Sequence, residues 1–352
     1  MRLSVKKLLK NGITYGIVIA AYIICQLMIG AGVMSRSMQG LLIPVCVYII
    51  MAISLNLVVG ISGELSLGHA GFMSIGAFSG IVIAQWLKVG FDAPVALQLL
   101  LAIVIGGICA SIAGVLIGIP VLRLRGDYLA IVTLAFGEII RNLLNCVYIS
   151  VEGKALHFSF NNPNLSGKLI FKGPTGATGV SRISTFFVGF VLVLITLFVV
   201  LNLINSRSGR AIKAIRDNRI AAETLGVNIT KYKMMAFVTS ATLAGMGGAL
   251  YGLNFSALAP SKFGFNQSIL ILVYVVLGGI GNIRGSIIAA TLLYVLPEVL
   301  RAFNDYRMLI YAIVLIVVML ATNNEHLKQL RQSLSEKLRR GKGAGRESEG
   351  GV

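Results

Sequence analysis

The chain of 352 residues is poor in charge, because only 12% of its residues are Asp, Glu, Lys or Arg. A soluble globular domain carries about 25% charged residues, so this composition cannot cover a water-facing surface. Hydrophobic residues make up 56% of the chain, and many of them lie in long uncharged runs. Such runs are typical of helices that cross a lipid bilayer. The composition therefore predicts an all-α, polytopic membrane protein, a bundle of transmembrane helices.

Motifs for enzyme chemistry are also missing. The sequence contains no GxxxxGK[ST] phosphate-binding loop, no HExxH, no GxSxG and no carboxylate pair spaced for acid–base catalysis. The four cysteines stand singly in apolar runs, and the three histidines lie far apart, so neither a disulfide framework nor a metal site is expected. The sequence predicts that this chain is not an enzyme and that it holds no cofactor and no metal.

Positive charge dominates, since 31 Lys and Arg residues stand against 13 Asp and Glu residues. The basic residues cluster in short loops and in the C-terminal tail, as cytoplasmic segments require, which argues against nucleic acid as a partner. Apolar run lengths predict about ten spans, and an even number places both termini in the cytoplasm. The expected spans are residues 12–33, 41–59, 69–87, 97–121, 128–149, 183–204, 234–253, 267–281, 285–302 and 307–322.

The chain is expected to divide into two parts. Residues 1–322 form the transmembrane domain, and residues 323–352 form a charged cytoplasmic tail that is partly disordered. Residues 150–182 are the largest predicted external loop. The glycine-dense runs 60–80 and 277–290 predict broken or re-entrant helices, which are tolerated only where the backbone faces protein or a water-filled cavity.

Glycines four residues apart recur in the other apolar runs. This spacing lets helix backbones approach closely, so it predicts a compact bundle. The pairs are Gly76/Gly80, Gly114/Gly118, Gly248/Gly252 and Gly281/Gly285.

Polar residues inside the spans are candidates for a translocation path. Asn56, Glu64 and His69 either line a water-filled cavity or tie turns together at the inner interface. Glu138 and Arg141 are three residues apart, so they share a helix face and can pair. An unpaired charge at the bilayer centre costs about 2.5–3.5 kcal/mol, so either a partner or a polar cavity is expected. A structural ion pair near the outer interface remains an equal alternative for these two residues.

The stretch from Ser206 to Lys233 is a polar and basic island between two apolar segments. Its apolar residues recur at helical spacing, which predicts two short amphipathic helices. Asp217 or Asn218 can begin the second helix, and Gly226 suits the left-handed backbone after its end. Either a partner protein or the lipid surface can cover such helices, so the pattern alone does not choose between them.

Four segments resemble the permease subunits of bacterial ABC importers for branched-chain amino acids, specifically the M-type inner-membrane component of binding-protein-dependent transport. They are NLVVGISGELSLGHAGFMSIGAF (56–78), RLRGDYLAIVTLAFGEIIRN (123–142), SGRAIKAIRDNRIAAETLGVNITKYKMMAFVTSATLAGMGGALYG (208–252) and VLGGIGNIRGSIIAA (276–290). The core TLAFGEIIR looks like the amino-acid permeases rather than the related sugar permeases. The run GPTGATGV (173–180) is similar to the family's glycine-rich external loop.

The resemblance implies an ATPase-coupling surface in the basic island. In this family a cytoplasmic loop carries the motif EAA, three residues and Gly, which docks the ATP-binding subunit. The positions that align with it here are Ile220, Ala221, Ala222 and Gly226. Ile220 stands where the motif has Glu, which removes one expected polar contact. Basic residues such as Arg216 and Arg219 are expected to rim the surface.

The resemblance also implies the working unit. Its partners would be two ATP-binding subunits, which bind the ATP, a second permease subunit, as in a heterodimer, and an external substrate-binding protein that docks on residues 150–182. The substrates would be leucine, isoleucine and valine, carried across the bacterial inner membrane. Two alternatives stay open: a related importer for urea, amides or sugars, and a stand-alone secondary transporter or channel. A membrane scaffold without a transport role is a third.

Overall fold

The computed structural model describes residues 2–32, 34–124, 126–160, 167–300, 306, 309–310 and 312–316. The chain divides into two compact units, residues 1–295 and 296–352. The first unit contains most of the described residues and all the residues predicted for the coupling surface and the path. The expected tail 323–352 and most of the expected span 307–322 lie outside the described residues.

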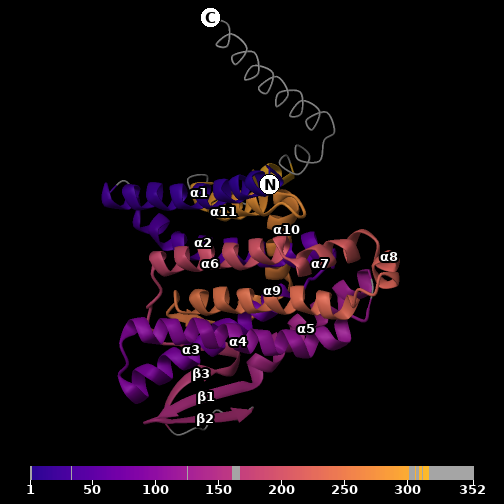
Figure 1. Cartoon of the computed structure of the whole chain (residues 1–352). Helices are drawn as coiled ribbons and strands as arrows, with labels where there is room; N and C mark the ends of the chain where they lie inside the picture. The colour runs from indigo at the N-terminus through magenta and orange to yellow at the C-terminus, as the bar shows by residue number, and fades with distance from the viewer. Residues whose placement is uncertain are drawn as a thin grey trace, which may run out of the picture. The chain divides into compact units, whose positions relative to one another are not determined.

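Helices make up most of the described chain (Figure 1). Six of them are long and apolar enough to cross a membrane, and each lies within a few residues of an expected span. Two further apolar stretches, Thr14–Gly30 and Phe265–Gly278, are shorter. The described helices of 14 or more residues are α1 (Arg2–Gly30), α2 (Arg36–Asn56), α3 (His69–Phe91), α4 (Val95–Val121), α5 (Asp127–Cys146), α6 (Phe186–Asn205), α9 (Ile229–Gly252), α10 (Phe265–Gly278) and α11 (Ile283–Val299). The chain is thus a helical, multi-pass membrane protein.

Glycine brings α3, α4 and α9 into backbone contact, and we call this region the glycine-faced core. A Cβ atom on Gly248 of α9 would lie 2.9 Å from the carbonyl carbon of Met73 in α3, closer than side chains pack. A Cβ atom on Gly114 of α4 would lie 2.8 Å from the Cβ atom of Ala241 in α9. The close packing predicted from glycines four residues apart is therefore confirmed for these helices.

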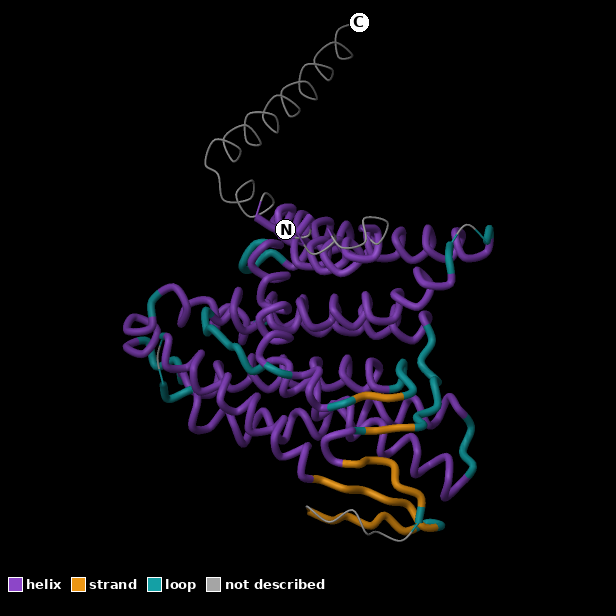
Figure 2. The backbone as a smooth tube through the Cα atoms, turned by 180° about the vertical axis from the view of Figure 1, so that it is seen from behind, coloured by secondary structure: helices purple, strands orange, loops and turns teal. Residues whose placement is uncertain are grey.

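The predicted external loop folds as a sheet, which the expectation of an all-α chain did not include. Five antiparallel strands follow the order β2–β1–β3–β4–β5, and the tube view shows them gathered beside the helices (Figure 2). A two-residue turn with Gly153 at φ 58° joins the first two strands. The strands are β1 (Val147–Glu152), β2 (Ala155–Phe160), β3 (Lys168–Lys172), β4 (Ala177–Thr178) and β5 (Ala257–Leu258).

The loops expected on one side of the membrane meet one another in the first unit. On the predicted outer side, β5 after α9 pairs with β4 of the loop before α6, and Trp86 Nε1 donates to the Lys154 carbonyl at 2.9 Å. On the predicted inner side, the turn after α2, the turn before α5 and the basic island line one hollow. The alternation of loops predicted from the charges therefore agrees with the contacts.

Candidate functional site

Three side-chain caps divide the basic island into short helices. Asn218 Oδ1 accepts the amide proton of Ala221 at 3.0 Å, and Ser206 and Asn228 cap the helices before and after in the same way. The result is α7 (Arg207–Asp217), α8 (Arg219–Thr224) and the start of α9. Gly226 has φ +77°, the left-handed conformation expected after a helix end. The predicted cap at Asn218 and the predicted left-handed backbone of Gly226 are both confirmed.

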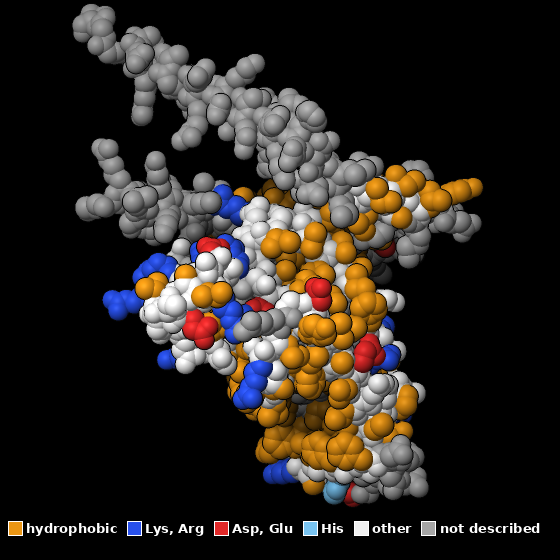
Figure 3. Space-filling model, turned by 90° about the vertical axis from the view of Figure 1, so that its right-hand side faces the viewer, with side chains coloured by type: hydrophobic (Ala, Val, Ile, Leu, Met, Phe, Trp, Pro, Cys, Tyr) orange, Lys and Arg blue, Asp and Glu red, His pale blue; other side chains and the backbone are white. Residues whose placement is uncertain are grey.

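The basic island has two groups of apolar side chains: one group packs inward, and the other is exposed on the outer surface. Ile215, Ala222 and Ile229 form a small buried cluster that joins α7, α8 and α9. Ile220 and Leu225, by contrast, are 76% and 83% exposed. Figure 3 views the first unit from the side that carries α8, where Lys and Arg side chains surround scattered apolar ones. The loop is thus a folded platform that presents bare aliphatic side chains between positive charges.

The predicted coupling residues do not all share this outer surface. Ala222 is buried in the cluster, whereas Ala221 and Ile220 face outward. Arg216, in the last turn of α7, reaches back toward α2 and donates from Nη1 to the Gly60 carbonyl at 2.9 Å. Arg219 lines the hollow behind the platform, and its buried Nε has no hydrogen-bond partner among the described residues. Arg216 therefore connects the platform to the segment after α2, whereas Arg219 borders the hollow.

The hollow behind α8 has a volume of about 280 Å³ and is lined by both signs of charge. Glu64 and Lys233 form an ion pair there, with side chains 11% and 8% exposed. This pair ties the turn after α2 to the second turn of α9. Because both charges are largely withdrawn from water, each depends on the other. Its lining residues are Gly63, Glu64, Leu65, Gly126, Asp127, Arg219 and Lys233.

Asn56 is fully buried at the end of α2 and uses both ends of its amide. Its Oδ1 accepts the amide proton of Gly281 at 2.8 Å, and its Nδ2 donates to Ser286 Oγ at 2.8 Å. Gly281 lies in the break between α10 and α11, and Ser286 lies in the first turn of α11, both within the second glycine-dense run of the sequence. The expected broken helix is present there, since Gly279 and Gly281 have φ +91° and +80°.

The remaining path candidates also have protein partners. His69 is 2% exposed at the start of α3, and its Nε2 lies 2.8 Å from Ser54 Oγ in α2.

Glu138 pairs with Arg141 at 2.6 Å, with both side chains about one-third exposed. Glu138 also accepts the amide proton of Phe265 at 3.1 Å, at the first residue of α10. It thereby caps a helix whose own N-cap residue, Gly264, has no side chain for the task.

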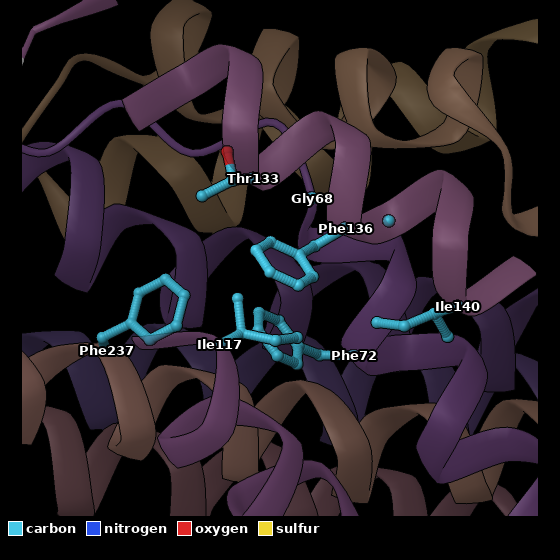
Figure 4. Close-up of a pocket in the computed structure, with 8 residues that line it drawn as sticks. Gly68, Phe72, Ile117, Thr133, Phe136, Ile140 and Phe237 are labelled. Atoms are coloured by element: carbon cyan, nitrogen blue, oxygen red, sulfur yellow. The ribbon is translucent and has the colours of Figure 1, made fainter. Parts of the chain in front are cut away.

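A narrow apolar crevice lies between α3, α4, α5 and α9 (Figure 4). The close-up shows the rings of Phe72, Phe136 and Phe237 pointing toward one another, with aliphatic side chains beside them. Thr133, which contributes the polar side chain of this lining, is already hydrogen-bonded to the Leu67 amide at 3.0 Å. The other lining residues are Gly68, Ile117, Gly137 and Ile140.

Comparison with known proteins identifies the family. Residues 37–319 match the model of a family described as "Branched-chain amino acid transport system / permease component". The chain belongs to this family. Two curated permeases agree with this, each named "High-affinity branched-chain amino acid transport system permease protein LivM". The one from Salmonella typhimurium is 36% identical over 313 residues, which cover 84% of this chain and 71% of the relative. The one from Escherichia coli is 36% identical over 317 residues, covering 86% and 72%.

A more distant permease shares a shorter stretch. The "Ribose import permease protein RbsC" of Haemophilus influenzae is 27% identical over 128 residues, which cover 34% of this chain and 39% of the relative. No solved structure matches the chain. The predicted resemblance to branched-chain amino-acid permeases is therefore confirmed, and its extent exceeds that of the sugar permease.

Sequence reasoning missed several residues of this permease-family site. Lys233, Ser286 and Gly281 were not singled out as partners, although they hold Glu64 and Asn56 in place. Their separations along the chain, 169 residues for Glu64 with Lys233 and 230 for Asn56 with Ser286, lie beyond any local pattern. The one available signal was the presence of polar residues in apolar runs, which require a partner at membrane depth.

Proposed function

We propose that the chain is the membrane permease subunit of an ABC importer that translocates leucine, isoleucine and valine. The observation that carries this proposal is the family match along residues 37–319, together with 36% identity to two branched-chain amino-acid permeases over most of this chain. Separate subunits would bind and hydrolyse ATP, because this sequence has no phosphate-binding loop. The permease itself would act as a path and not as an enzyme.

The platform formed by α7 and α8 would be the dock for the ATP-binding subunit. An exposed aliphatic pair on a short helix, here Ile220 and Leu225, is the kind of anchor that enters an apolar groove of a partner. The aligned motif positions support the same surface, since Ala221 lets a partner approach closely and Gly226 sets the turn behind the helix. Arg216 would serve the dock from behind, by fixing the platform to the segment after α2, and Arg219 would border the hollow behind it.

In the membrane we propose ten spans with both termini in the cytoplasm of a bacterial cell and residues 206–233 on the same side. Residues 1–322 would form the transmembrane domain and residues 323–352 the cytoplasmic tail. The excess of Lys and Arg in the segments assigned to the inside supports this orientation. Asn56, Glu64, His69, Glu138 and Arg141 would border the path, because buried polar groups in spans tend to mark substrate routes.

The working assembly would contain two ATP-binding subunits, a second permease subunit as a heterodimer partner and an external substrate-binding protein. The antiparallel sheet is the proposed dock for the binding protein, because it folds the largest predicted external loop into a firm surface.

Transport competition tests the substrate. The assembled importer, reconstituted in vesicles with its binding protein, should take up labelled leucine in an ATP-dependent manner, and unlabelled isoleucine and valine should compete. Failure of all three amino acids, with competition by ribose or urea instead, would assign the related importer class. Uptake by the chain alone, driven by an ion gradient, would assign a secondary transporter.

The dock has its own test. Ile220→Asp combined with Leu225→Asp places two charges on the proposed anchor, so the ATP-binding subunits should no longer copurify with the permease. Phe158→Asp, which changes a 62% exposed aromatic on β2, is the matched control and should leave copurification intact. Retention of the ATP-binding subunits by the doubly substituted chain would contradict the proposed dock.

A further inference from the structure

A π-helical segment ends α2 and lies between the basic island and the break in α10–α11. It is η1 (Leu57–Ser62), and all six of its residues are buried. A π-turn holds one more residue per hydrogen-bonded ring than an α-turn, so it is rare and is found mostly at functional sites. Here it continues the 26-residue apolar stretch Ser37–Ser62 without a break. The contacts on its two sides indicate what this widened turn does.

On one side, η1 is fastened to the basic island through Arg216. The Gly60 carbonyl of η1 accepts a hydrogen bond from Arg216 Nη1 at 2.9 Å. The stem of the same side chain packs on Gly63, where a Cβ atom would lie 2.6 Å from Arg216 Cγ. Asp217 accepts from the Nε and Nη2 atoms of Arg216 at 3.0 and 2.8 Å, which holds the guanidinium plane in this orientation. Arg216 is therefore a direct link between α7 and Gly60.

On the other side, η1 is fastened to the break between α10 and α11. Gly60 lies against Gly281 so closely that a Cβ atom on Gly60 would overlap the Gly281 amide nitrogen and Asn56 Oδ1. Asn56, the residue before η1, accepts from the Gly281 amide and donates to Ser286, both at 2.8 Å. Gly60 thus contacts the basic island through its carbonyl oxygen and the α10–α11 break through its Cα atom.

We propose that η1 is the joint through which movement of the coupling platform reaches the α10–α11 break, with Arg216 as its positioning residue. We call this set the inner joint: Asn56, Gly60, Arg216, Gly281 and Ser286. The inference rests on the proposed function, in which an ATP-binding subunit moves the platform. A π-turn can give up its extra residue and shift register, and the non-helical backbone at Gly279–Gly281 can change its dihedral angles without breaking a regular ladder. Both sides of the joint therefore have an alternative arrangement available.

Substitution of Arg216 separates transmission from docking. In the reconstituted importer, Arg216→Gln removes the charge and shortens the reach to Gly60, so leucine uptake should fall about tenfold, the scale of typical coupling free energies. The ATP-binding subunits should still copurify, because the exposed anchor residues Ile220 and Leu225 are unchanged, and the ratio of leucine transported to ATP hydrolysed should fall. Arg216→Lys, which keeps a cationic donor, should restore part of the uptake.

The matched control is Arg210→Gln, which removes an equal charge from the same helix. The Arg210 guanidinium donates to the Asn205 carbonyl at 3.5 Å, at the end of α6, and has no hydrogen bond to η1 among the described residues. The Arg210→Gln variant should leave the ratio of amino acid transported to ATP hydrolysed unchanged. Equal losses in Arg210→Gln and Arg216→Gln, or normal uptake in Arg216→Gln, would overturn the proposal.

Amide hydrogen exchange follows the joint directly and keeps the two proposals apart. In the unchanged importer, addition of ATP should alter exchange both in residues 206–233 and in residues 278–286. In Arg216→Gln the first change should persist and the second should disappear. No change in residues 206–233 of the unchanged importer would contradict the proposed coupling platform itself. A change there without one at 278–286 would overturn the joint and leave the platform intact.

Discussion

The glycine-faced core and the inner joint both rely on glycine, but they use it in opposite ways. In the core, Gly114 and Gly248 are helical residues whose missing side chains let backbones touch over several turns. In the joint, Gly281 has φ +80° and lies in the break between α10 and α11 rather than inside a helix. Dispersion contacts between close backbones are numerous and resist displacement, whereas the joint depends on a few directional hydrogen bonds. The glycine-faced core is therefore suited to hold its helices in one arrangement, whereas the inner joint is suited to a change of conformation.

The largest expected effect comes from filling the core. Gly248→Leu directs a side chain at the Met73 backbone, which cannot move aside as a flexible side chain would. The cost should exceed the ~1–3 kcal/mol that is typical of overpacking, so little folded protein should be recovered. Gly16→Leu is the control, because no atom lies within 4 Å of a Cβ there. Size-exclusion profiles after detergent extraction measure the result, and a monodisperse Gly248→Leu protein would contradict the rigid core.

Removal of one partner from the buried ion pair should have the next largest effect. Glu64→Gln leaves the Lys233 charge with 8% side-chain exposure and without its paired carboxylate. Loss of one partner from a buried pair costs about 3–5 kcal/mol, so the thermal midpoint of the purified protein should fall clearly. The double substitution Glu64→Gln and Lys233→Gln should regain much of the loss. If the double substitution is as unstable as the sum of the single ones, the two side chains do not depend on each other.

A smaller effect is expected where the platform turns into α9. Gly226→Val places a β-branched residue at φ +77°, although no atom lies within 4 Å of its Cβ. The left-handed conformation costs an L-residue about 1–2 kcal/mol, and this strain should distort α8 without unfolding the membrane helices. ATP hydrolysis should then uncouple from amino-acid uptake while membrane insertion remains normal. Unchanged uptake would remove this turn from the coupling surface.

The smallest effect is expected at the N-terminal end of α10, where Glu138 accepts the Phe265 amide proton. The Glu138–Arg141 pair is about one-third exposed, and exposed pairs contribute about 0–1 kcal/mol. Glu138→Ala should cost little more than this, because it also removes the acceptor of the Phe265 amide. Glu138→Gln keeps that acceptor and should be nearly neutral in thermal unfolding. A large loss of leucine uptake with unchanged stability would instead favour a role in the path.

Local patterns were sufficient to predict six spans, the cap at Asn218 and the glycine packing. Apolar runs, Asn218 and Gly226 each carry their signal within a few neighbouring residues. The sheet had a local signal too: polar and apolar residues alternate through 147–160 on both sides of the Gly153–Lys154 turn, a pattern typical of a hairpin. The inner joint had none, since Arg216 meets Gly60 across 156 residues and the meeting depends on how whole helices pack.

The length of α10 has a consequence for the membrane around it. Its 14 residues span about 21 Å at about 1.5 Å per residue, which is shorter than the ~30 Å of a typical hydrocarbon layer. In the proposed ten-span arrangement, peptide groups at one end of α10 lie at hydrocarbon depth without a helix to satisfy them, and lipid offers no hydrogen bonds. The amide of Gly281, taken up by the Asn56 side chain, is such a group. The irregular backbone around Gly281 therefore takes its hydrogen bond from a protein side chain rather than from water.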